Sequence, residues 1–403
     1  MTPAKKISPV TLTVILGAMA ALTPISMDMY LPALPVMVGD LNASAAQGQW
    51  TLAAFFFGMA VGQLFYGRSS DKIGRRPIFF FSVALYVAAT LVCAISPRIE
   101  AVIGMRLVEA LGACGATVIS RAVIFDLYDS REGARFLSRM VLVQGLAPIL
   151  APLAGGVLAV TLGWRAVFYA LAAFGVLLAL AVWFIVPETR SKEARAISQG
   201  ESALTAYLAV LRNRPLMQIS LAGSLGAASF FTYLANAPQL LIGAFHIPPD
   251  HFGYYFGANA IGFVAAAQVN RALLSRFSPN WILTRATIAT TGAALILLIG
   301  SKLTTVFGIW AVLVPMFLLV SSFSFIQSNA MAIAQGYDKQ RPGAVAAISG
   351  SVALGCGSLS ALLSGQVFDG TATPMAIIIL CACSLAIVLC VTAPKPPSAI
   401  ISH

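Results

Sequence analysis

Apolar segments close to 20 residues long repeat along this chain from residue 11 to residue 392, and they constrain its fold more than any other feature. About 20 consecutive apolar residues let an α-helix cross the hydrocarbon core of a bilayer. Only 10% of the 403 residues are charged, whereas soluble domains carry about 25%. The sequence therefore predicts an all-α polytopic membrane protein, and it excludes a β-barrel, whose strands would be short and alternating.

Twelve membrane spans are predicted, at 11–38, 47–66, 78–96, 99–121, 136–160, 164–186, 215–242, 252–275, 280–300, 304–334, 343–367 and 372–392. The first has no convincing small-residue cleavage site, so it is expected to stay in the protein rather than act as a signal peptide. The tenth is longer than a straight helix needs. All six cysteines lie in apolar runs, where they are expected to pack as small apolar side chains, without disulfides or metal.

Lysine and arginine are distributed unevenly between the segments that join these spans. With the N-terminus in the cytoplasm, 20 of the 25 belong to the inner segments and three to the outer segments. Because cationic side chains favour the cytoplasmic side, both termini are predicted to be cytoplasmic. Topology then explains the net charge of +11, and nucleic-acid binding has no other support.

The longest polar stretch, residues 187–214, divides the chain into two halves of six spans each. We predict an N-terminal six-helix bundle at 1–186, a cytoplasmic linker at 187–214, and a C-terminal bundle with a short tail at 215–403. Two halves related as parallel repeats enclose a central cavity near the middle of the membrane. An i, i+3, i+4, i+7 apolar pattern predicts a short interfacial helix in the linker, through Leu204, Tyr207, Leu208 and Leu211.

Charged residues are rare inside the predicted spans, where each costs roughly 2.5–3.5 kcal/mol to insert and usually faces a cavity or a partner. At a rise of about 1.5 Å per residue, Asp28 and Glu109 lie about 15 Å below the outer edge and Arg106 about 10 Å. Arg106 and Glu109 are also i, i+3 neighbours on one helix face. Arg121, about 33 Å down by the same rise, can reach the inner surface and is expected to be structural.

Two simpler interpretations of these charges stay open. Asp28 is interfacial if its helix ends at Leu31, and Arg106 with Glu109 can form a private ion pair that serves only packing. An apolar cavity disfavours the charged form of a carboxyl group, whereas a nearby arginine favours it. A carboxyl group balanced between these effects can exchange protons near neutral pH, which is the physical basis of a proton-coupled transporter.

The inner loop after the second span reads GRSSDKIGRR, Gly67 to Arg76. It resembles the G-x-x-x-D-[RK]-x-G-[RK]-[RK] signature of the major facilitator superfamily, although an ordinary basic turn is the alternative. The resemblance implies that Asp71 caps the start of the eleventh helix and that Arg75 pairs with Asp126 below the fourth span. The residues expected to govern conformation here are Gly67, Asp71, Gly74, Arg75, Arg76, Arg121 and Asp126.

Two spans carry further family motifs. The fourth, RLVEALG from Arg106, is similar to the family's R-x-x-Q-G motif but has Glu109 in place of Gln. The fifth, QGLAPILAPLAGG from Gln144 to Gly156, resembles the motif that marks drug antiporters, with a generic kinked helix as the alternative. Its small residues allow close helix approach and its prolines allow bending, through Gly145, Pro148, Pro152, Gly155 and Gly156.

The first-span sequence SMDMYLPALP resembles the signature of the Bcr/CflA branch of drug:proton antiporters, and FGYYFGAN and SNAMA are similar to its bicyclomycin-resistance proteins. The resemblance implies a multi-pass protein of the bacterial inner membrane that exports antibiotics such as bicyclomycin, sulfonamides or phenicols in exchange for protons. It also implies that Asp28 and Arg106 bind proton or substrate, without a cofactor or metal. Glu109 and Phe125 depart from the pattern, and Glu109 is a rival proton site.

Drug sites combine apolar and aromatic walls with a few polar groups. The candidates for the cavity wall are Tyr30, Phe230, Phe231, Tyr233, Asn236, Gln239, Tyr255, Asn259, Gln327 and Asn329. We expect drug to enter from inside while Asp28 or Glu109 is deprotonated, the halves to rock outward, and a proton to displace the drug. The partners expected are drug, protons and lipid, and the protein is expected to be a monomer.

Other function classes are less well supported by the sequence. A metabolite transporter would share the fold but lack the Gly/Pro pattern of the fifth span. An ATP-driven pump would need a G-x-x-x-x-G-K-[ST] phosphate loop, which the sequence does not contain. A membrane-embedded enzyme would need a metal or nucleophile constellation, and the three histidines provide none within the spans.

Overall fold

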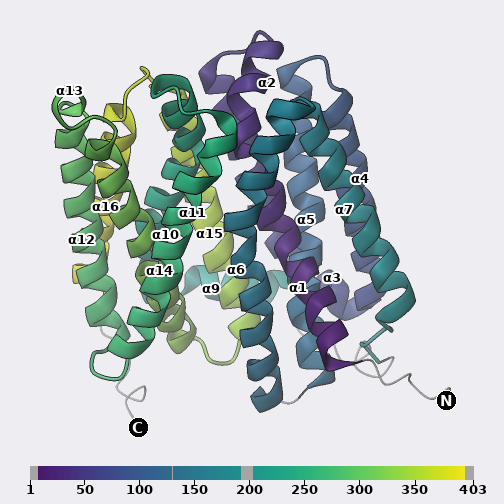
Figure 1. Ribbon diagram of the computed structural model, residues 1–403. Coiled ribbons are helices and arrows are strands. Elements are labelled where there is room, and N and C mark those ends of the chain that lie inside the picture. Colours follow the sequence, from purple (N-terminus) through teal and green to yellow (C-terminus); the bar gives the residue numbers. More distant parts are fainter. Residues whose placement is uncertain (1–7, 129, 192–202, 395–403) are drawn as a thin grey trace.

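The computed structural model describes residues 8–128, 130–191 and 203–394, and every regular element in them is helical. The N-terminal half consists of α1 (Pro9–Asp28), η1 (Leu31–Ala33), α2 (Leu34–Asp40), α3 (Ala45–Ile73), α4 (Arg75–Ile95), α5 (Ile99–Leu127), α6 (Ser130–Thr161) and α7 (Trp164–Ile185). The C-terminal half consists of α10 (Arg214–Pro238), η2 (Gln239–Ala244), α11 (Pro249–Leu273), α12 (Pro279–Gly300), α13 (Thr304–Phe307), α14 (Trp310–Tyr337), α15 (Pro342–Gln366) and α16 (Thr373–Thr392). Figure 1 shows the two halves side by side.

The long helices coincide with the twelve predicted spans. Within the described residues, nine helical segments are long and apolar enough to cross a membrane by length and composition. The other three predicted spans are α6, α10 and α11, which have 32, 25 and 25 residues. The prediction of an all-α, multi-span membrane protein is confirmed, whereas the side of the membrane on which each end lies stays a prediction.

The first span is a broken helix. Its α-helical part ends at Asp28, a 3-10 turn follows from Leu31 to Ala33, and α2 continues the segment to Asp40. Pro32 and Pro35 each lie in the first turn of a new helical piece, where proline is tolerated because its missing N–H would have no helical partner. The helix therefore stops before Leu31, and the Asp28 side chain is buried in protein at 2% exposure.

The tenth predicted span, 304–334, is two helices. The short α13 ends at Phe307, Gly308 adopts a φ of +57°, and α14 then runs from Trp310 to Tyr337. Glycine reaches this left-handed conformation without the steric penalty that other residues pay. The excess length noted in the sequence is therefore a short outer helix, and the spanning helix begins later than predicted.

The linker helix is also present. Helix α9 covers Ala203–Arg212, and the Tyr207 hydroxyl donates to the carbonyl oxygen of Leu64 in α3 at 2.8 Å. Val210 is buried in a cluster with Leu216 of α10 and Val345 of α15, so α9 contacts both halves. The three leucines of the predicted apolar face are exposed, with Leu204 at 66%.

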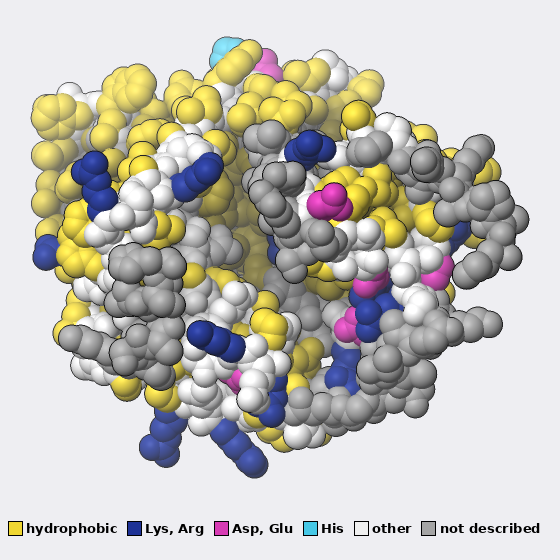
Figure 2. Space-filling model, turned by 90° about the horizontal axis from the view of Figure 1, so that it is seen from below, with side chains coloured by type: hydrophobic (Ala, Val, Ile, Leu, Met, Phe, Trp, Pro, Cys, Tyr) yellow, Lys and Arg dark blue, Asp and Glu magenta, His cyan; other side chains and the backbone are white. Residues whose placement is uncertain are grey.

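The two halves meet mainly through α3 against α15 and through α6 against α11. Small residues let these helices approach closely: Ser358 of α15 donates to the carbonyl oxygen of Ala53 in α3, and Gly253 of α11 lies against Leu153 of α6. Seen from the end where α1 begins, the molecule is hollowed between the halves, with hydrophobic side chains in the hollow and basic side chains around it (Figure 2).

Candidate functional site

Asp28 ends α1 at the point where the first span breaks. Its carboxyl group is buried, and its Oδ1 atom accepts no hydrogen bond from the described residues. Tyr233 of α10 lies within electrostatic range of this carboxyl group. Asp28 therefore faces the C-terminal half, with an oxygen atom whose hydrogen-bonding capacity is unused.

Arg106 and Glu109 of α5 form an ion pair inside the N-terminal half. Arg106 Nη1 lies 3.0 Å from Glu109 Oε2, and both side chains are completely buried. The same Nη1 donates to the carbonyl oxygen of Ser26 at 3.2 Å. The guanidinium also lies 4.5 Å from the ring centroid of Tyr30 and 4.3 Å from that of Phe55, a cation–π arrangement that partly compensates a buried charge.

The estimated membrane depths of Asp28, Arg106 and Glu109 are similar, but in the structure Asp28 lies apart from the other two residues. Ser26 bonds to Tyr86 and contacts Arg106, so this face of α1 is turned toward α4 and α5. Asp28 is two residues further, or about 200° around the helix. No contact between Asp28 and the Arg106–Glu109 pair occurs among the described residues. The pair is close to neutral as a unit, and the Asp28 carboxyl is left between the halves.

The predicted cavity residues fall into three environments. Tyr30 packs inside the N-terminal half, where its hydroxyl bonds to Thr51, and Asn329 packs inside the C-terminal half, where it donates to Asn270 at 2.8 Å. Gln327 is exposed and Tyr255 is half-buried. The remaining candidates lie at or near the contact between the halves.

Aromatic and amide side chains of α10 and its neighbours form a wall beside Asp28. Tyr233 accepts a hydrogen bond from Asn259 of α11 at 2.8 Å. Phe230 stacks on Phe323 of α14 with ring centroids 4.4 Å apart. Phe231 meets Phe56 of α3 at 4.9 Å, across the two halves. This wall offers apolar area with a few placed polar atoms, as small-molecule sites do.

A buried ring of hydrogen bonds joins the halves near the ends of three helices that are predicted to face outward. Gln49 Nε2 of α3 donates to Asn236 Oδ1 of α10 at 3.2 Å, and Asn236 Nδ2 donates to Ser364 Oγ of α15 at 3.0 Å. Ser364 Oγ returns a bond of 3.1 Å to Gln49 Oε1. Asn236 was among the predicted cavity residues, whereas Gln49 and Ser364 were not. Both are isolated polar residues near the ends of predicted spans, and the only sequence signal for Gln49 is the rule that buried amides need partners. We call these three residues the outer ring.

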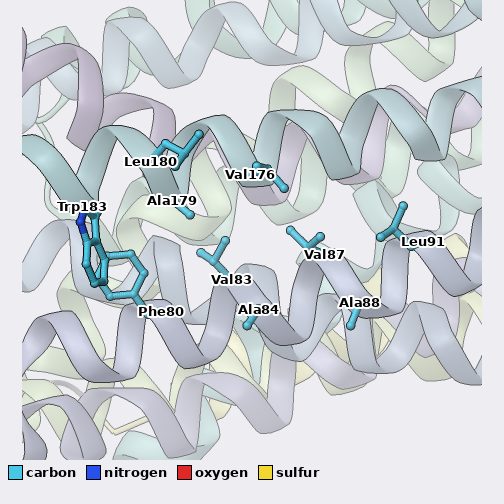
Figure 3. Close-up of a pocket in the computed structure, with 10 residues that line it drawn as sticks. All are labelled: Phe80, Val83, Ala84, Val87, Ala88, Leu91, Val176, Ala179, Leu180 and Trp183. Carbon is cyan, nitrogen blue, oxygen red and sulfur yellow. The ribbon is translucent and has the colours of Figure 1, made fainter.

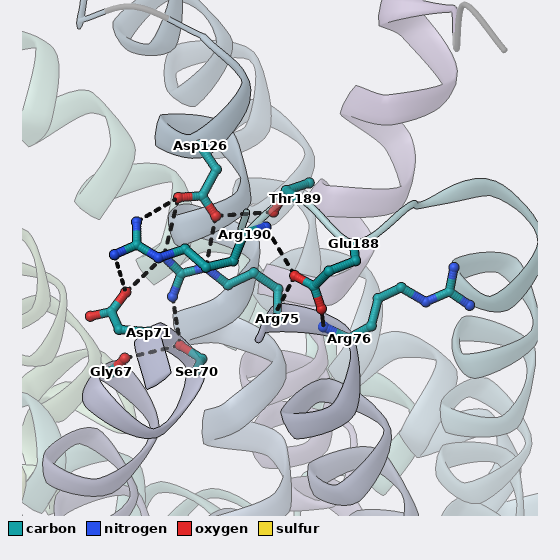
Figure 4. Close-up of polar contacts among 9 residues, drawn as sticks. All are labelled: Gly67, Ser70, Asp71, Arg75, Arg76, Asp126, Glu188, Thr189 and Arg190. Carbon is teal, nitrogen blue, oxygen red and sulfur yellow. Dashed lines mark hydrogen bonds and ion pairs between the residues drawn. The ribbon is translucent and has the colours of Figure 1, made fainter. Parts of the chain in front are cut away.

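The residues of the GRSSDKIGRR loop lie at the opposite end, around Asp126 (Figure 4). Arg75 Nε donates to Asp126 Oδ2 at 2.8 Å and its Nη2 donates to Oδ1 at 3.2 Å, so the predicted contact between these residues is present. Gly74 makes the turn between α3 and α4 with a φ of 119°. Asp71 pairs with Arg75 at 2.8 Å. We call this cluster the inner latch.

One prediction for the loop is wrong. Asp71 was expected to cap the eleventh helix, but α15 begins after Arg341 without a side-chain cap from the described residues. Arg75 follows Asp71 by four residues, and the Asp71 carboxylate pairs with the Arg75 guanidinium instead. Arg121 is exposed, as expected of a side chain that reaches the surface.

Linker residues complete the inner latch, and the sequence did not indicate them. Thr189 Oγ1 donates to Asp126 Oδ2 at 3.0 Å, and Arg190 Nη1 lies 3.6 Å from Asp126 Oδ1. The Glu188 carboxylate accepts from the backbone N–H groups of Arg75 and Arg76 at 2.9 and 3.1 Å. An anion at a helix N-terminus is stabilised by the unpaired N–H groups there, so Glu188 anchors the linker to the start of α4.

The Gly/Pro motif of the fifth span lies in α6, which packs against α11 of the other half. Pro148 and Pro152 are inside α6. A Cβ atom on Gly155 would overlap the carbonyl oxygen of Met29, and one on Gly156 would overlap that of Pro249 in α11. Gly145 has no neighbouring atom within 4 Å of such a position. The two outer glycines are therefore needed for close packing, whereas Gly145 and Gly67 lie in open surroundings.

Comparison with known proteins identifies the class. Residues 16–361 match the model of the Major Facilitator Superfamily, and the chain belongs to that family. The family consists of transporters, so the protein is a multi-pass membrane transporter and not an enzyme. Among solved structures, a D-xylose-proton symporter shares the fold with a TM-score of 0.72 at 15% identity, covering 96% of this chain and 98% of that one.

Relatives at higher identity include proteins named for drug resistance. A bicyclomycin resistance protein homolog of Haemophilus influenzae is 29% identical over 360 residues, which are 89% of this chain and 90% of the relative. A multidrug resistance protein MdtL of Klebsiella pneumoniae is 28% identical over 388 residues, which are 94% and 95% of the two chains.

Proposed function

We propose that this transporter exports small antibiotics in exchange for protons, and that Asp28 is the carboxylate that exchanges proton for drug. The observation that carries the proposal is the buried Asp28 carboxyl group, which faces the C-terminal half with an unbonded oxygen. A buried carboxylate without partners is unfavourable, so either a proton or a polar ligand must satisfy it. Proton and drug can therefore compete for the Asp28 carboxylate.

The arrangement around Asp28 favours drug-sized substrates with apolar or aromatic surface. The Phe230–Phe323 stack and the Tyr233–Asn259 pair supply apolar area and a few hydrogen-bonding atoms. Glu109 already compensates Arg106, so this pair offers little net positive charge to an anionic substrate. One relative is named for bicyclomycin resistance and another for multidrug resistance, which supports small antibiotics as the substrate class. Bicyclomycin, sulfonamides and phenicols are the substrates that we propose to test.

The transport cycle that fits this geometry opens and closes the outer ring, while the inner latch holds the linker to the N-terminal half. With the outer ring closed, drug enters the hollow between the halves and binds next to deprotonated Asp28. Parting of the outer ring opens the site outward, where a proton reaches Asp28 and drug leaves. The neutral carboxyl group is cheaper to bury than the charged one, which favours return to the inward-facing state.

The test measures proton release when drug is added to purified protein. In Asp28→Asn, the neutral side chain cannot exchange a proton, so we expect release to vanish and drug efflux from proteoliposomes to uncouple from the pH gradient. Glu109→Gln is the matched control, because it removes a buried carboxylate that already has a partner. Normal release in Asp28→Asn with loss in folded Glu109→Gln would move the proton site to Glu109.

The same proteoliposomes distinguish antiport from import. A metabolite transporter of this fold would accumulate its substrate along the direction of the proton gradient, and drug would neither bind nor release protons. Uptake of that kind by the wild type, with no drug-dependent proton release, would rule out the proposed export.

A further inference from the structure

An apolar groove lies between α4 and α7, on the edge of the N-terminal half farthest from the other half (Figures 1 and 3). Its volume is about 620 Å³, within the range of roughly 300–1,000 Å³ that ligand pockets occupy. All ten lining residues are apolar: Phe80, Val83, Ala84, Val87, Ala88, Leu91, Val176, Ala179, Leu180 and Trp183. The groove is separate from the site around Asp28, and the proposed export does not use it.

The length of the groove corresponds to one leaflet. From Phe80 to Leu91 the helix rises about 16 Å at 1.5 Å per residue, close to half of a hydrocarbon core about 30 Å thick. Alanines at 84, 88 and 179 keep the lining of the groove small, and Leu180 and Trp183 are 49% and 59% exposed. One acyl chain of an inner-leaflet lipid fits these dimensions.

The inner end of the groove carries a fixed cation. The Arg76 guanidinium lies 5.6 Å from the ring centroid of Phe80 and 5.7 Å from that of Trp183. Its Nη1 donates to the carbonyl oxygen of Val186 at 3.0 Å and its Nη2 to that of Trp183 at 3.2 Å. A guanidinium has five N–H donors, so three remain without a partner among the described residues.

Arg76 is set apart from the anions near it. Figure 4 shows its side chain directed away from the inner latch, and Glu188 binds its backbone N–H rather than its guanidinium. The planar, weakly hydrated guanidinium suits bidentate recognition of phosphate. Arg76 lies in the first turn of α4. Basic side chains gather on the face of the molecule that Figure 2 shows, and such a face would attract an anionic leaflet.

We propose that the groove between α4 and α7 is a binding site for one anionic phospholipid of the inner leaflet, with an acyl chain along Val83 and Val87 and the headgroup phosphate on Arg76. In such a complex the Trp183 ring would lie at headgroup level, where amphipathic rings are favoured. The lipid would cover apolar area that no described element covers, and it would brace α4 beside the inner latch.

Trp183 provides a direct readout, because brominated acyl chains quench tryptophan fluorescence on contact. The protein has five tryptophans, and a variant that keeps Trp183 with the other four changed to Phe reports on the groove. Reconstituted with phosphatidylglycerol or phosphatidylcholine of the same brominated chains, we expect half-maximal quenching at about fivefold lower content of the anionic lipid. Arg76→Gln should abolish that preference, and Ala84→Phe should reduce quenching by both lipids.

A variant that keeps only Trp281 is the matched control. Trp281 is also exposed near the inner end of its helix, α12, with the Arg285 guanidinium 5.5 Å from its ring centroid, but it does not line the groove. Equal quenching of Trp183 by both lipids, an unchanged preference in Arg76→Gln, or the same preference at Trp281 would overturn the proposal. So would crosslinking that joins two copies through α4 and α7. Unfolding temperatures confirm that each variant is folded.

Discussion

Gln49 and Asn236, from opposite halves of the transporter, share a buried hydrogen bond of 3.2 Å near the outer ends of α3 and α10. Ser364 closes the ring with both of them. Because the ring is a polar contact between the halves, alternating access requires that these bonds break when the site opens on the side predicted to be outer. Its members then exchange protein partners for water, so little net energy opposes the opening.

A disulfide across this contact should lock the outer side. A Cβ atom on Gly365 would lie 3.1 Å from the Cβ atom of Gln49, a few tenths of an ångström shorter than the range of about 3.5–4.5 Å found in disulfides. In a background without the native cysteines, we expect oxidised Gln49→Cys/Gly365→Cys to form the bond and lose transport, which reductant restores. Transport in proteoliposomes before and after reduction measures the effect.

The control pair uses the same two helices. A Cβ atom on Gly355 of α15 would have no neighbouring atom within 4 Å, so Gln49→Cys/Gly355→Cys should stay reduced and active. Full activity of the oxidised Gln49/Gly365 pair, with the crosslink shown by mass spectrometry, would mean that the outer ring does not part during transport.

Asp126 should hold the linker to the N-terminal half. It accepts from Arg75 and Thr189 and pairs with Arg190, and its side chain is 10% exposed. Charge-assisted hydrogen bonds contribute roughly 1.5–3 kcal/mol each, so Asp126→Asn should loosen the latch. We expect trypsin to cleave after Arg190 several-fold faster, measured as the initial rate of limited proteolysis with the cut site identified by mass.

Asp71→Asn is the comparison for this prediction. Asp71 pairs with the same Arg75 but is 40% exposed, and exposed ion pairs contribute little. A cleavage rate raised as much by Asp71→Asn as by Asp126→Asn would show that overall charge, and not the buried contact, controls the linker.

Gly155→Ala should disturb the packing of α6 against the break in the first span. The added methyl group would overlap the Met29 carbonyl oxygen, and forced insertion into a packed contact typically costs about 1–3 kcal/mol. We expect a lower unfolding temperature in detergent and weaker drug resistance of cells that express the variant. Gly145→Ala in the same helix meets open space and should leave both unchanged; equal losses in the two variants would contradict the packing argument.

The Arg106–Glu109 pair should show strong coupling in a double-mutant cycle. Removing one member of a buried pair leaves an uncompensated charge, at about 3–5 kcal/mol, so Arg106→Gln and Glu109→Gln should each lower stability. The double variant should be more stable than the sum of the two effects, as measured by unfolding in mixed micelles. A Glu109→Gln variant as stable as wild type would indicate that Glu109 is already protonated in the folded protein.

The number and placement of spans could be predicted because the length of an apolar run and the positions of lysine and arginine are properties of the sequence. They do not depend on how the helices pack against one another. The helix ends could not. The second and fourth spans were predicted to end at residues 66 and 121, but α3 and α5 continue to Ile73 and Leu127. Ion pairs such as Arg75–Asp126 stabilise these polar last turns as helix. A hydropathy pattern does not show such ion pairs.

The sequence predicted how deep the ionisable side chains of the candidate site lie along their helices. It did not predict the direction in which each side chain points around its helix. The sequence placed Asp28, Arg106 and Glu109 at similar depths; the break after Asp28 and the Ser26–Tyr86 bond set the rotation that turns Asp28 away from the pair. Thr189 and Glu188 were missed for a related reason. Their role depends on where the linker returns to α4, which a linear pattern does not encode.

The ion pair in α5 also bears on how this protein enters the membrane. Arg106 and Glu109 lie one turn apart on the same helix, so each can compensate the other as soon as that helix forms. No other segment has to arrive first to shield either charge during insertion by the translocation machinery. Asp28 has no such companion on its own helix, and its carboxyl group must enter the bilayer neutral or wait for the second half of the chain to be made.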